Sequence, residues 1–187
     1  QKPTFAQNID FLVSYQLGHM YYRYFMWNFA GRQNDMQGQG LDFERGNWIS
    51  GIEALDKGRV GPQQNLPAIK KANKGRNVYY MLPLILGLIG LIYHLRRDNK
   101  DFVVVAMLFV LTGIAINVYL NPEPLQPRER DYAYVGSFYA FAIWIGLGVM
   151  ALWELLRKKA PEAVSAAAVT AICLVAVPGI LASENWD

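Results

Sequence analysis

Four long apolar runs dominate the second half of the 187-residue sequence and restrict the folds open to it. Each run has about the length that an α-helix needs to cross a hydrocarbon core about 30 Å thick. Inside lipid, backbone polar groups must be satisfied within the segment itself, so a helix is the expected structure. The runs cover residues 79–95, 102–120, 135–156 and 163–182. They predict an all-α, polytopic integral membrane protein with four transmembrane helices.

The composition supports this class and argues against several others. The chain is 53% hydrophobic and only 18% charged, and its net charge of +3 is concentrated in short loops, so we expect no nucleic-acid partner. A single cysteine, Cys173, lies inside an apolar run, without a disulfide partner or a cluster typical of zinc. We therefore expect neither a metal nor another cofactor. The chain begins at Gln1 rather than methionine, which suggests a piece of a longer protein.

Basic residues in two connecting loops predict how the spans are oriented. Short cytoplasmic loops carry an excess of lysine and arginine. The loop after the first run and the loop after the third run both show this excess, and four alternating spans place these two loops on one side. The extracytoplasmic side would then hold residues 1–78, 121–134 and 183–187. The basic residues are Arg96, Arg97 and Lys100 in one loop and Arg157, Lys158 and Lys159 in the other.

The residues before the first run divide into two segments. Residues 8–31 carry apolar side chains at helical spacing, so residues 1–31 are interpreted as an amphipathic helix at the membrane interface, or as the tail of an upstream span. Residues 32–78 are rich in Gly, Asn, Gln and Pro and predict a long external loop with a few short helical turns. The bundle would occupy 79–182, and 183–187 would begin an external C-terminal segment.

A dense group of charges precedes the third run, in the stretch "QPRERDY". Arg128 and Arg130 could grip a phosphate through bidentate guanidinium hydrogen bonds, with Glu129 and Asp131 orienting them. The alternative is that the four charges form interfacial ion pairs and cap the next helix, since acidic side chains suit a helix N-terminus. The residues alone leave both readings open.

Two further groups could contribute to a substrate pocket on the same face. One is Arg32 and Asp35 in "GRQND", which a helix-ending turn would also explain. The other is His19 and Arg23, which are four residues apart and so lie on one side of a helix. A structural role for His19 is the simpler alternative. The chain contains no phosphate-binding loop, dinucleotide fingerprint, nucleophile elbow or HExxH motif.

Two long motifs carry a resemblance to a known family. They are "NPEPLQPRERDYAYVGSFYAFAIWIGLG" and "YYRYFMWNFAGRQNDMQG". With these, the chain resembles the bacterial membrane proteins known as the domain of unknown function 2723 family, which is related to the transmembrane protein O-mannosyltransferases of the GT-C superfamily. The resemblance extends over essentially the whole chain, including "GNWISGI", "LPLILGLIGLIYH" and "ENWD".

The resemblance implies an inverting glycosyltransferase of the bacterial inner membrane. Such enzymes typically transfer a sugar from a polyprenyl-phosphate donor to an extracytoplasmic acceptor, in some cases a protein, and the lack of a metal-ligand cluster in this sequence fits a lipid phosphate leaving group stabilised by arginine. Their catalytic acidic residue generally lies in the first external loop, upstream of these residues, so the catalytic residue here is unknown. The resemblance makes Arg128 and Arg130 the preferred donor-phosphate ligands. The expected partners are membrane lipids, the polyprenyl-phosphate sugar donor and the extracytoplasmic acceptor of the sugar, in some cases a protein.

A competing hypothesis is a non-catalytic membrane protein. A transporter or a scaffold in an envelope assembly would also explain the apolar runs. No run carries an acidic residue at mid-depth, and this weakens the case for a proton-coupled transporter in particular.

Overall fold

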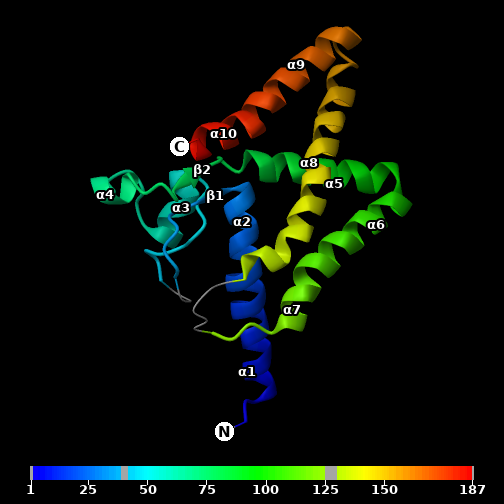
Figure 1. Ribbon diagram of the computed structural model, residues 1–187. Coiled ribbons are helices and arrows are strands. Elements are labelled where there is room, and N and C mark those ends of the chain that lie inside the picture. The colour runs from blue at the N-terminus through cyan, green and yellow to red at the C-terminus, as the bar shows by residue number, and fades with distance from the viewer. Residues whose placement is uncertain (1, 39–41, 125–129, 187) are drawn as a thin grey trace.

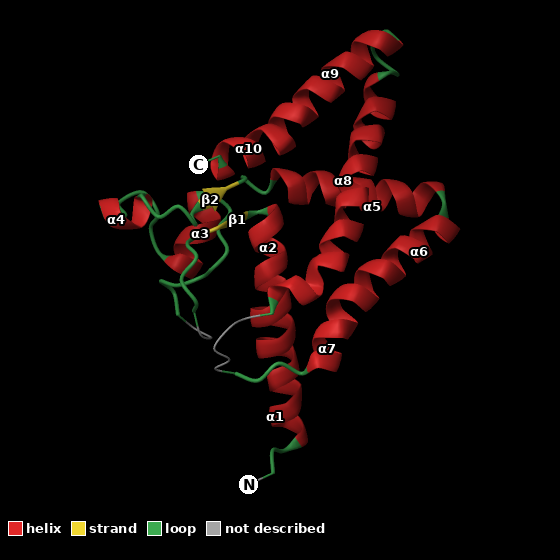
Figure 2. Cartoon of the chain, in the orientation of Figure 1, coloured by secondary structure: helices red, strands yellow, loops and turns green. Residues whose placement is uncertain are grey.

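The protein is mainly helical, and a single short antiparallel ribbon is the only sheet in the part described (Figure 2). The computed structural model describes residues 2–38, 42–124 and 130–186. The helices form an extended bundle, and the loop region (residues 31–78) packs against one side of it (Figure 1). The expectation of a helical architecture is therefore confirmed.

The chain begins with one unbroken helical stretch from Phe5 to Phe29. Thr4 caps it, because its hydroxyl accepts a hydrogen bond from the Gln7 amide while the Gln7 side chain accepts one from the Thr4 amide. The first six residues are exposed, and the last seven pack into the bundle, so the α1 end projects away from the rest of the molecule (Figure 1). The segments are α1 (Phe5–Asp10), the π-helix η1 (Phe11–Tyr22) and α2 (Arg23–Phe29).

The loop region closes on itself through a two-stranded ribbon that the sequence did not predict. In this antiparallel ribbon, Gly31 lies opposite Val78 and Arg32 lies opposite Asn77. Two short helices lie between the strands. The elements are β1 (Gly31–Arg32), α3 (Glu53–Val60), α4 (Ala68–Lys71) and β2 (Asn77–Val78).

Within the described residues, three helices are long and apolar enough to cross a membrane: Asn99–Leu120, Asp131–Leu156 and Glu162–Asn185. They support the integral-membrane class and correspond to the second, third and fourth predicted spans. Each is continuous but contains a change of helix type. Their segments are α6 (Asn99–Val110), η2 (Leu111–Ala115) and α7 (Ile116–Leu120); η3 (Asp131–Tyr134) and α8 (Val135–Leu156); and α9 (Glu162–Leu174), η4 (Val175–Gly179) and α10 (Ile180–Asn185).

The first predicted span, 79–95, is not confirmed as a transmembrane helix. Tyr80 and Met81 have positive φ angles of 52° and 57°, so the helix α5 begins only at Leu82 and ends at Arg97. Its 16 residues correspond to a length of about 24 Å at about 1.5 Å per residue, short of the hydrocarbon core. The described residues therefore contain three helices of spanning length rather than the four expected.

Helix α5 crosses α8 at a contact between the two backbones. A methyl group on Gly90 would lie 1.7 Å from the Trp144 carbonyl oxygen, and one on Gly148 would lie 2.2 Å from that of Leu86. Only glycine permits this separation, and small residues serve the same purpose in membrane helix pairs generally. The crossing point fixes α5 against the longest span.

An aromatic cluster joins the N-terminal helix to the bundle. Phe25 and Phe29 of α2 contact Phe141 of α8, with ring centroids 4.9 and 4.6 Å apart. Trp144 and Phe109 extend the cluster, with their centroids 5.5 Å apart. Aromatic pairs at these separations add to the stabilisation from burial alone. The α2 end of the first helix is thus part of the helical core.

The end of the described chain returns to the loop region. The Val78 amide donates a hydrogen bond to Glu184 (2.8 Å), and the Asn77 side-chain amide donates one to Asn185 (2.9 Å). In contrast, the α5–α6 turn and the α8–α9 turn lie far from the loop region (Figure 1). These two turns contain the basic loops.

Candidate functional site

A cavity of about 540 Å³ lies between the N-terminal helix and the loop region. We call it the His19 cavity. Its volume is in the range of small-molecule sites, about 300–1,000 Å³. One wall comes from the first helix and the other from residues 47–59. The lining residues are Asp10, Ser14, Tyr15, Gly18, His19, Tyr22, Arg23, Asn47, Trp48 and Arg59.

The π-helical winding of η1 explains the first wall. In a π-helix each amide hydrogen-bonds to the carbonyl five residues earlier, which widens the turn. Such segments are rare in proteins overall, but those that occur are often found at functional sites. Residues four and five apart then share one face, which is the spacing of the lining residues from Asp10 to Arg23. The His19 ring stacks on Tyr15, with centroids 5.6 Å apart. The helix therefore presents a row of polar and aromatic side chains to the cavity.

The second wall is held by backbone contacts to the end of the first helix. The Ile49 amide donates to the Gly31 carbonyl (3.0 Å), and the Gln33 amide donates to the Asn47 carbonyl (2.9 Å). These bonds bring Trp48 beside the helix, where its ring meets Tyr22 edge to face at 6.2 Å. The cavity thus depends on contacts between residues distant in sequence.

Arg59 of α3 contributes a cationic group to the same wall. Its guanidinium carbon lies 3.7 Å from the centre of the Trp48 ring, and its Nη2 donates to the Trp48 carbonyl. Burial lowers the pKa of Arg59, and the Asp56 carboxylate partly opposes this effect. Its Nε is buried without a hydrogen-bond partner among the described residues. The cavity wall therefore carries a half-buried guanidinium group in which one N–H donor, at Nε, is not used by the described residues.

Asp56 holds Arg59 and the preceding turn in place. Its side chain is fully buried and accepts hydrogen bonds from the amides of Ser50 and Gly51, both at 2.9 Å. It also accepts bonds from the Ser50 hydroxyl (3.1 Å) and from Arg59 Nη2 (3.3 Å). A buried carboxylate is tolerated only when it is paired in this way. Asp56 therefore supports the site without lining it.

The structure brings His19 and Arg23 together at the cavity, as their spacing suggested. Arg23 is only 5% exposed, and its Nε donates to the His19 carbonyl at 2.9 Å. Its Nη1 reaches the Gly46 carbonyl at 3.2 Å, and the guanidinium also lies over the Trp27 ring at 4.8 Å. Arg23 thus joins the helix to the loop region, and its role toward a substrate stays a prediction.

Arg32 and Asp35 lie elsewhere and do not line the His19 cavity. Arg32 Nε donates to the Gly75 carbonyl at 2.7 Å, and the Asn73 side-chain amide donates to Asp35 at 3.2 Å. Both residues therefore stabilise the turn before β2 through these hydrogen bonds. The four predicted pocket residues form two separate groups.

Of the four charged residues in the stretch "QPRERDY", only Arg130 and Asp131 are described. Arg128 and Glu129 lie outside the described residues. Arg130 is exposed, and the Asp131 carboxylate accepts a hydrogen bond from the Tyr132 amide at 3.0 Å, at the start of η3. Asp131 thus lies in the first turn of η3, where an acidic side chain is favourable, but no side-chain hydrogen bond caps this helix among the described residues. The phosphate hypothesis stays a prediction.

The described part of the connection after α7 is attached to the edge of the cavity. Tyr15, a lining residue, donates from its hydroxyl to the Glu123 carbonyl at 3.1 Å. The neighbouring Gln16 donates from its side chain to Asn121 at 2.6 Å. The cavity therefore lies beside the end of the span Asn99–Leu120.

A buried polar chain reinforces this junction. Asn117 is fully buried in the span, donates to the Gln16 carbonyl and accepts from the Tyr134 hydroxyl at 2.9 Å. It links three elements: η1, α7 and η3. Polar side chains that satisfy one another in this way join helices in apolar surroundings.

Sequence reasoning missed part of this wall. Four of the lining residues, Asp10, Asn47, Trp48 and Arg59, were not among the expected site residues. The spacing of Asp56 and Arg59, three apart on a short helix, was the one local sequence signal for this wall of the cavity.

No group of three His, Cys, Asp or Glu side chains that could hold a metal ion is found in the described ranges. No family model, curated protein or solved structure matches the chain.

Proposed function

We propose that the chain is part of a membrane glycosyltransferase that takes its sugar from a polyprenyl-phosphate donor and passes it to an extracytoplasmic acceptor, including protein. The observation that carries the proposal is the His19 cavity beside the end of a spanning helix. A lipid-linked donor keeps its phosphate at the membrane boundary, so its site must lie there. The resemblance of the long motifs supports the same reaction class.

The cavity offers the groups that such a donor needs. Arg59 supplies a half-buried guanidinium, which suits a phosphate because its fixed fork of donors matches the anion's oxygens. The Trp48 and Tyr22 rings offer apolar surface with a polar edge, a combination suited to sugar rings. The Asp10 carboxylate can accept hydrogen bonds from the O–H groups of a sugar. Each part of a phosphosugar thus has a complementary group.

The orientation belongs to the same proposal. The two basic turns lie far from the loop region, so a cytoplasmic position for them puts the His19 cavity on the extracytoplasmic side (Figure 1). Residues 1–78, 121–134 and 183–187 are then external, in a bacterial inner membrane. Cysteine labelling from outside intact cells at Lys57→Cys and Lys158→Cys tests it. We expect labelling only at position 57, and the reverse pattern would refute the orientation.

Turnover of the full-length protein tests the reaction. With a polyprenyl-phosphate sugar donor, we expect Arg59→Gln to lower kcat/KM for the donor at least tenfold, since a charge-assisted hydrogen bond contributes about 1.5–3 kcal/mol. The matched control is Lys74→Gln, which removes an exposed charge from the same loop region and should leave kcat/KM unchanged. Equal kcat/KM for Arg59→Gln and wild type would remove the cavity from the donor site.

The stretch before the third span has its own test. We propose that Arg128 and Arg130 contribute to binding the donor phosphate, oriented by Glu129 and Asp131. Arg130→Ala and Arg128→Ala should each raise KM for the donor, and Arg130→Lys should restore it only in part because lysine lacks the planar fork. Unchanged donor KM and turnover in both alanine variants would leave capping as the role of these charges.

A further inference from the structure

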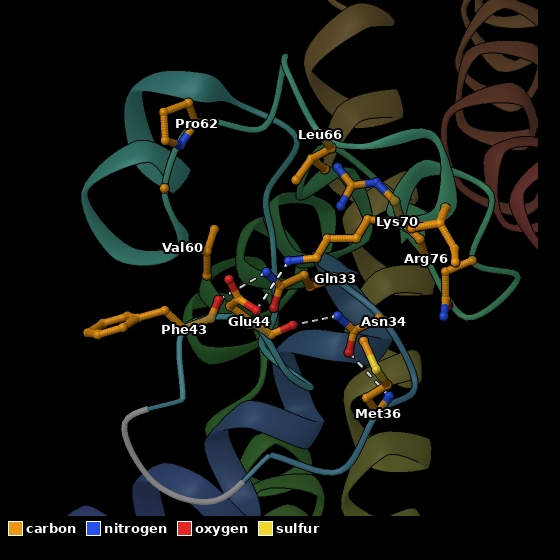
Figure 3. A pocket seen from close by; sticks show the side chains of 13 residues that line it. Gln33, Asn34, Met36, Phe43, Glu44, Val60, Pro62, Leu66, Lys70 and Arg76 are labelled. Atoms are coloured by element: carbon orange, nitrogen blue, oxygen red, sulfur yellow. Dashed lines mark hydrogen bonds and ion pairs between the residues drawn. The ribbon is translucent and has the colours of Figure 1, made fainter.

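A second cavity of about 390 Å³ lies wholly within the loop region. We call it the Lys70 cavity; Figure 3 shows its lining. It shares no lining residue with the His19 cavity, and its volume again falls in the range of small-molecule sites. Nothing in the proposed transferase reaction requires it, so its chemistry has to be read from its own walls.

One wall of the Lys70 cavity is apolar. It is made by the end of α3 and the chain that follows, with Val60 buried and Pro62 and Leu66 continuing the surface. In Figure 3, Val60 and Pro62 lie on the opposite side of the cavity from Arg76. A ligand in this space would gain affinity by removing its own apolar surface from water. The wall suits a hydrocarbon chain or ring.

The neutral polar groups of the lining are already used by the protein. The Gln33 side-chain amide donates to the Phe43 carbonyl (3.1 Å), and that of Asn34 donates to the Glu44 carbonyl (2.8 Å). These bonds hold residues 43 and 44 against the chain after β1 and give the cavity a preformed wall. A sugar, which needs many neutral hydrogen-bonding partners, would find few in this cavity.

Two cations remain, and both face the cavity. Arg76 is half-buried, and among the described residues its guanidinium makes one hydrogen bond, from Nη1 to Gln63 Oε1 at 3.1 Å. Lys70 Nζ lies 3.3 Å from a Glu44 carboxylate oxygen, and the Glu44 side chain is 74% exposed. Exposed ion pairs of this kind contribute little, so an incoming anion can displace Glu44. The charged side of the cavity therefore suits an anionic group.

We propose that the Lys70 cavity binds a small anionic amphiphile, namely an apolar chain or ring that carries a carboxylate or a phosphate. The anionic group lies between Lys70 and Arg76, and the apolar part packs on Val60, Pro62 and Leu66. The ligand is either a free small acid or a lipid with the same headgroup chemistry. The inference is independent of the proposed transferase activity.

Binding of water-soluble probes tests both halves of the ligand. We would titrate hexanoate and hexyl phosphate into the full-length protein in discs of zwitterionic phospholipid, by calorimetry, with hexanol and inorganic phosphate alongside. The two amphiphilic anions should bind at least tenfold more tightly than either comparison compound. If hexanol bound as tightly as hexanoate, the proposed role of the two cations would be wrong. If inorganic phosphate bound as tightly as hexyl phosphate, the proposed role of the apolar wall would be wrong. Anionic phospholipid added to the discs should weaken hexyl phosphate binding only if a lipid is the natural ligand.

Variants assign the effect to the cavity. Lys70→Gln and Arg76→Gln should each lower hexanoate affinity about tenfold, as expected for loss of a charge-assisted bond. Lys71→Gln removes the adjacent exposed charge, which does not line the cavity, and should bind as wild type does. Lys70 is on the surface, so its replacement keeps the test valid even if the Arg76 variant folds poorly. Wild-type affinity in Lys70→Gln would overturn the proposal.

Discussion

The helical bundle and the loop region are stabilised in different ways. In the bundle, α5 and α8 meet at Gly90 and Gly148, and aromatic rings fill the space beside α2. In the loop region, side chains such as Asn34 and Asp56 hydrogen-bond to the backbone of other turns, six to ten residues away. Added volume should therefore damage the bundle most, whereas loss of a single polar group should damage the loop region most. Both cavities lie against the second kind of structure.

The largest effect should come from adding volume at the α5–α8 crossing. Gly90→Leu places a side chain into the backbone of α8, so we expect a loss of about 4–5 kcal/mol in the free energy of unfolding, or failure to assemble. Gly146→Leu, on the partner helix α8, is the control, since a Cβ there meets nothing within 4 Å. Thermal unfolding in lipid discs measures both. Equal destabilisation of the two variants would contradict the backbone contact at Gly90.

Removing the buried carboxylate should damage the loop region selectively. Asp56→Ala leaves the Ser50 and Gly51 amides and Arg59 without their partner, at a cost of about 3 kcal/mol. Hydrogen exchange should rise in residues 48–60, with the exchange of α8 unchanged. Glu44→Gln, at an exposed carboxylate, should show neither effect. Unfolding of bundle and loop region together in Asp56→Ala would show that the two are not separately stabilised.

The junction between the two regions should be intermediate in sensitivity. Asn117→Leu removes both hydrogen bonds of a fully buried side chain, the one to the Gln16 carbonyl and the one from the Tyr134 hydroxyl, and should lower the free energy of unfolding by about 2 kcal/mol. Asn28→Leu is the comparison, because within the described parts of the chain the Asn28 side chain hydrogen-bonds to its own helix, at the Tyr24 carbonyl. Chemical unfolding compares them. If Asn117→Leu lost less free energy of unfolding than Asn28→Leu, the buried polar side chains around Asn117 would not be a structural link between the two regions.

The smallest effect should be at the attachment of α10, and it depends on pH. Burial raises the pKa of Tyr79, while its hydrogen bond with Asn185 partly opposes this shift. A raised pKa means that the neutral hydroxyl stabilises the folded state below about pH 10 and that this stability is lost as pH rises through the folded pKa.

Removing the hydroxyl tests this attachment. Tyr79→Phe should cost about 1 kcal/mol at neutral pH and flatten the loss of stability above pH 10. Tyr80→Phe, at the exposed neighbour, should keep the wild-type profile. Unfolding measured from pH 7 to 11 provides the comparison. If the free energy of unfolding of Tyr79→Phe fell above pH 10 as steeply as that of the wild type, the loss of stability would belong to another titrating group.

Local pattern predicted the helices, because length and apolar content are properties of one segment. It failed at residues 79–81, where Tyr80 and Met81 adopt a left-handed backbone that no propensity favours. The ribbon between Gly31–Arg32 and Asn77–Val78 has two residues per strand, too few to produce an alternating pattern.

The site divides in the same way. His19 and Arg23 were predictable because they share one helix face. Arg59 and Trp48 join them only through backbone contacts such as that of Ile49 with Gly31. Long-range contacts of this kind are not visible in a single sequence without the fold.

Photolabelling provides the most direct test of the proposed donor site. A polyprenyl-phosphate sugar carrying a photoreactive group on the sugar would be bound to the full-length protein in lipid discs, irradiated and mapped by peptide mass spectrometry. We expect labels within residues 10–23 and 47–59, the two walls of the His19 cavity, and competition by unlabelled donor. Competable labelling confined to other residues, with both walls unlabelled, would contradict the assignment of this cavity to the sugar donor.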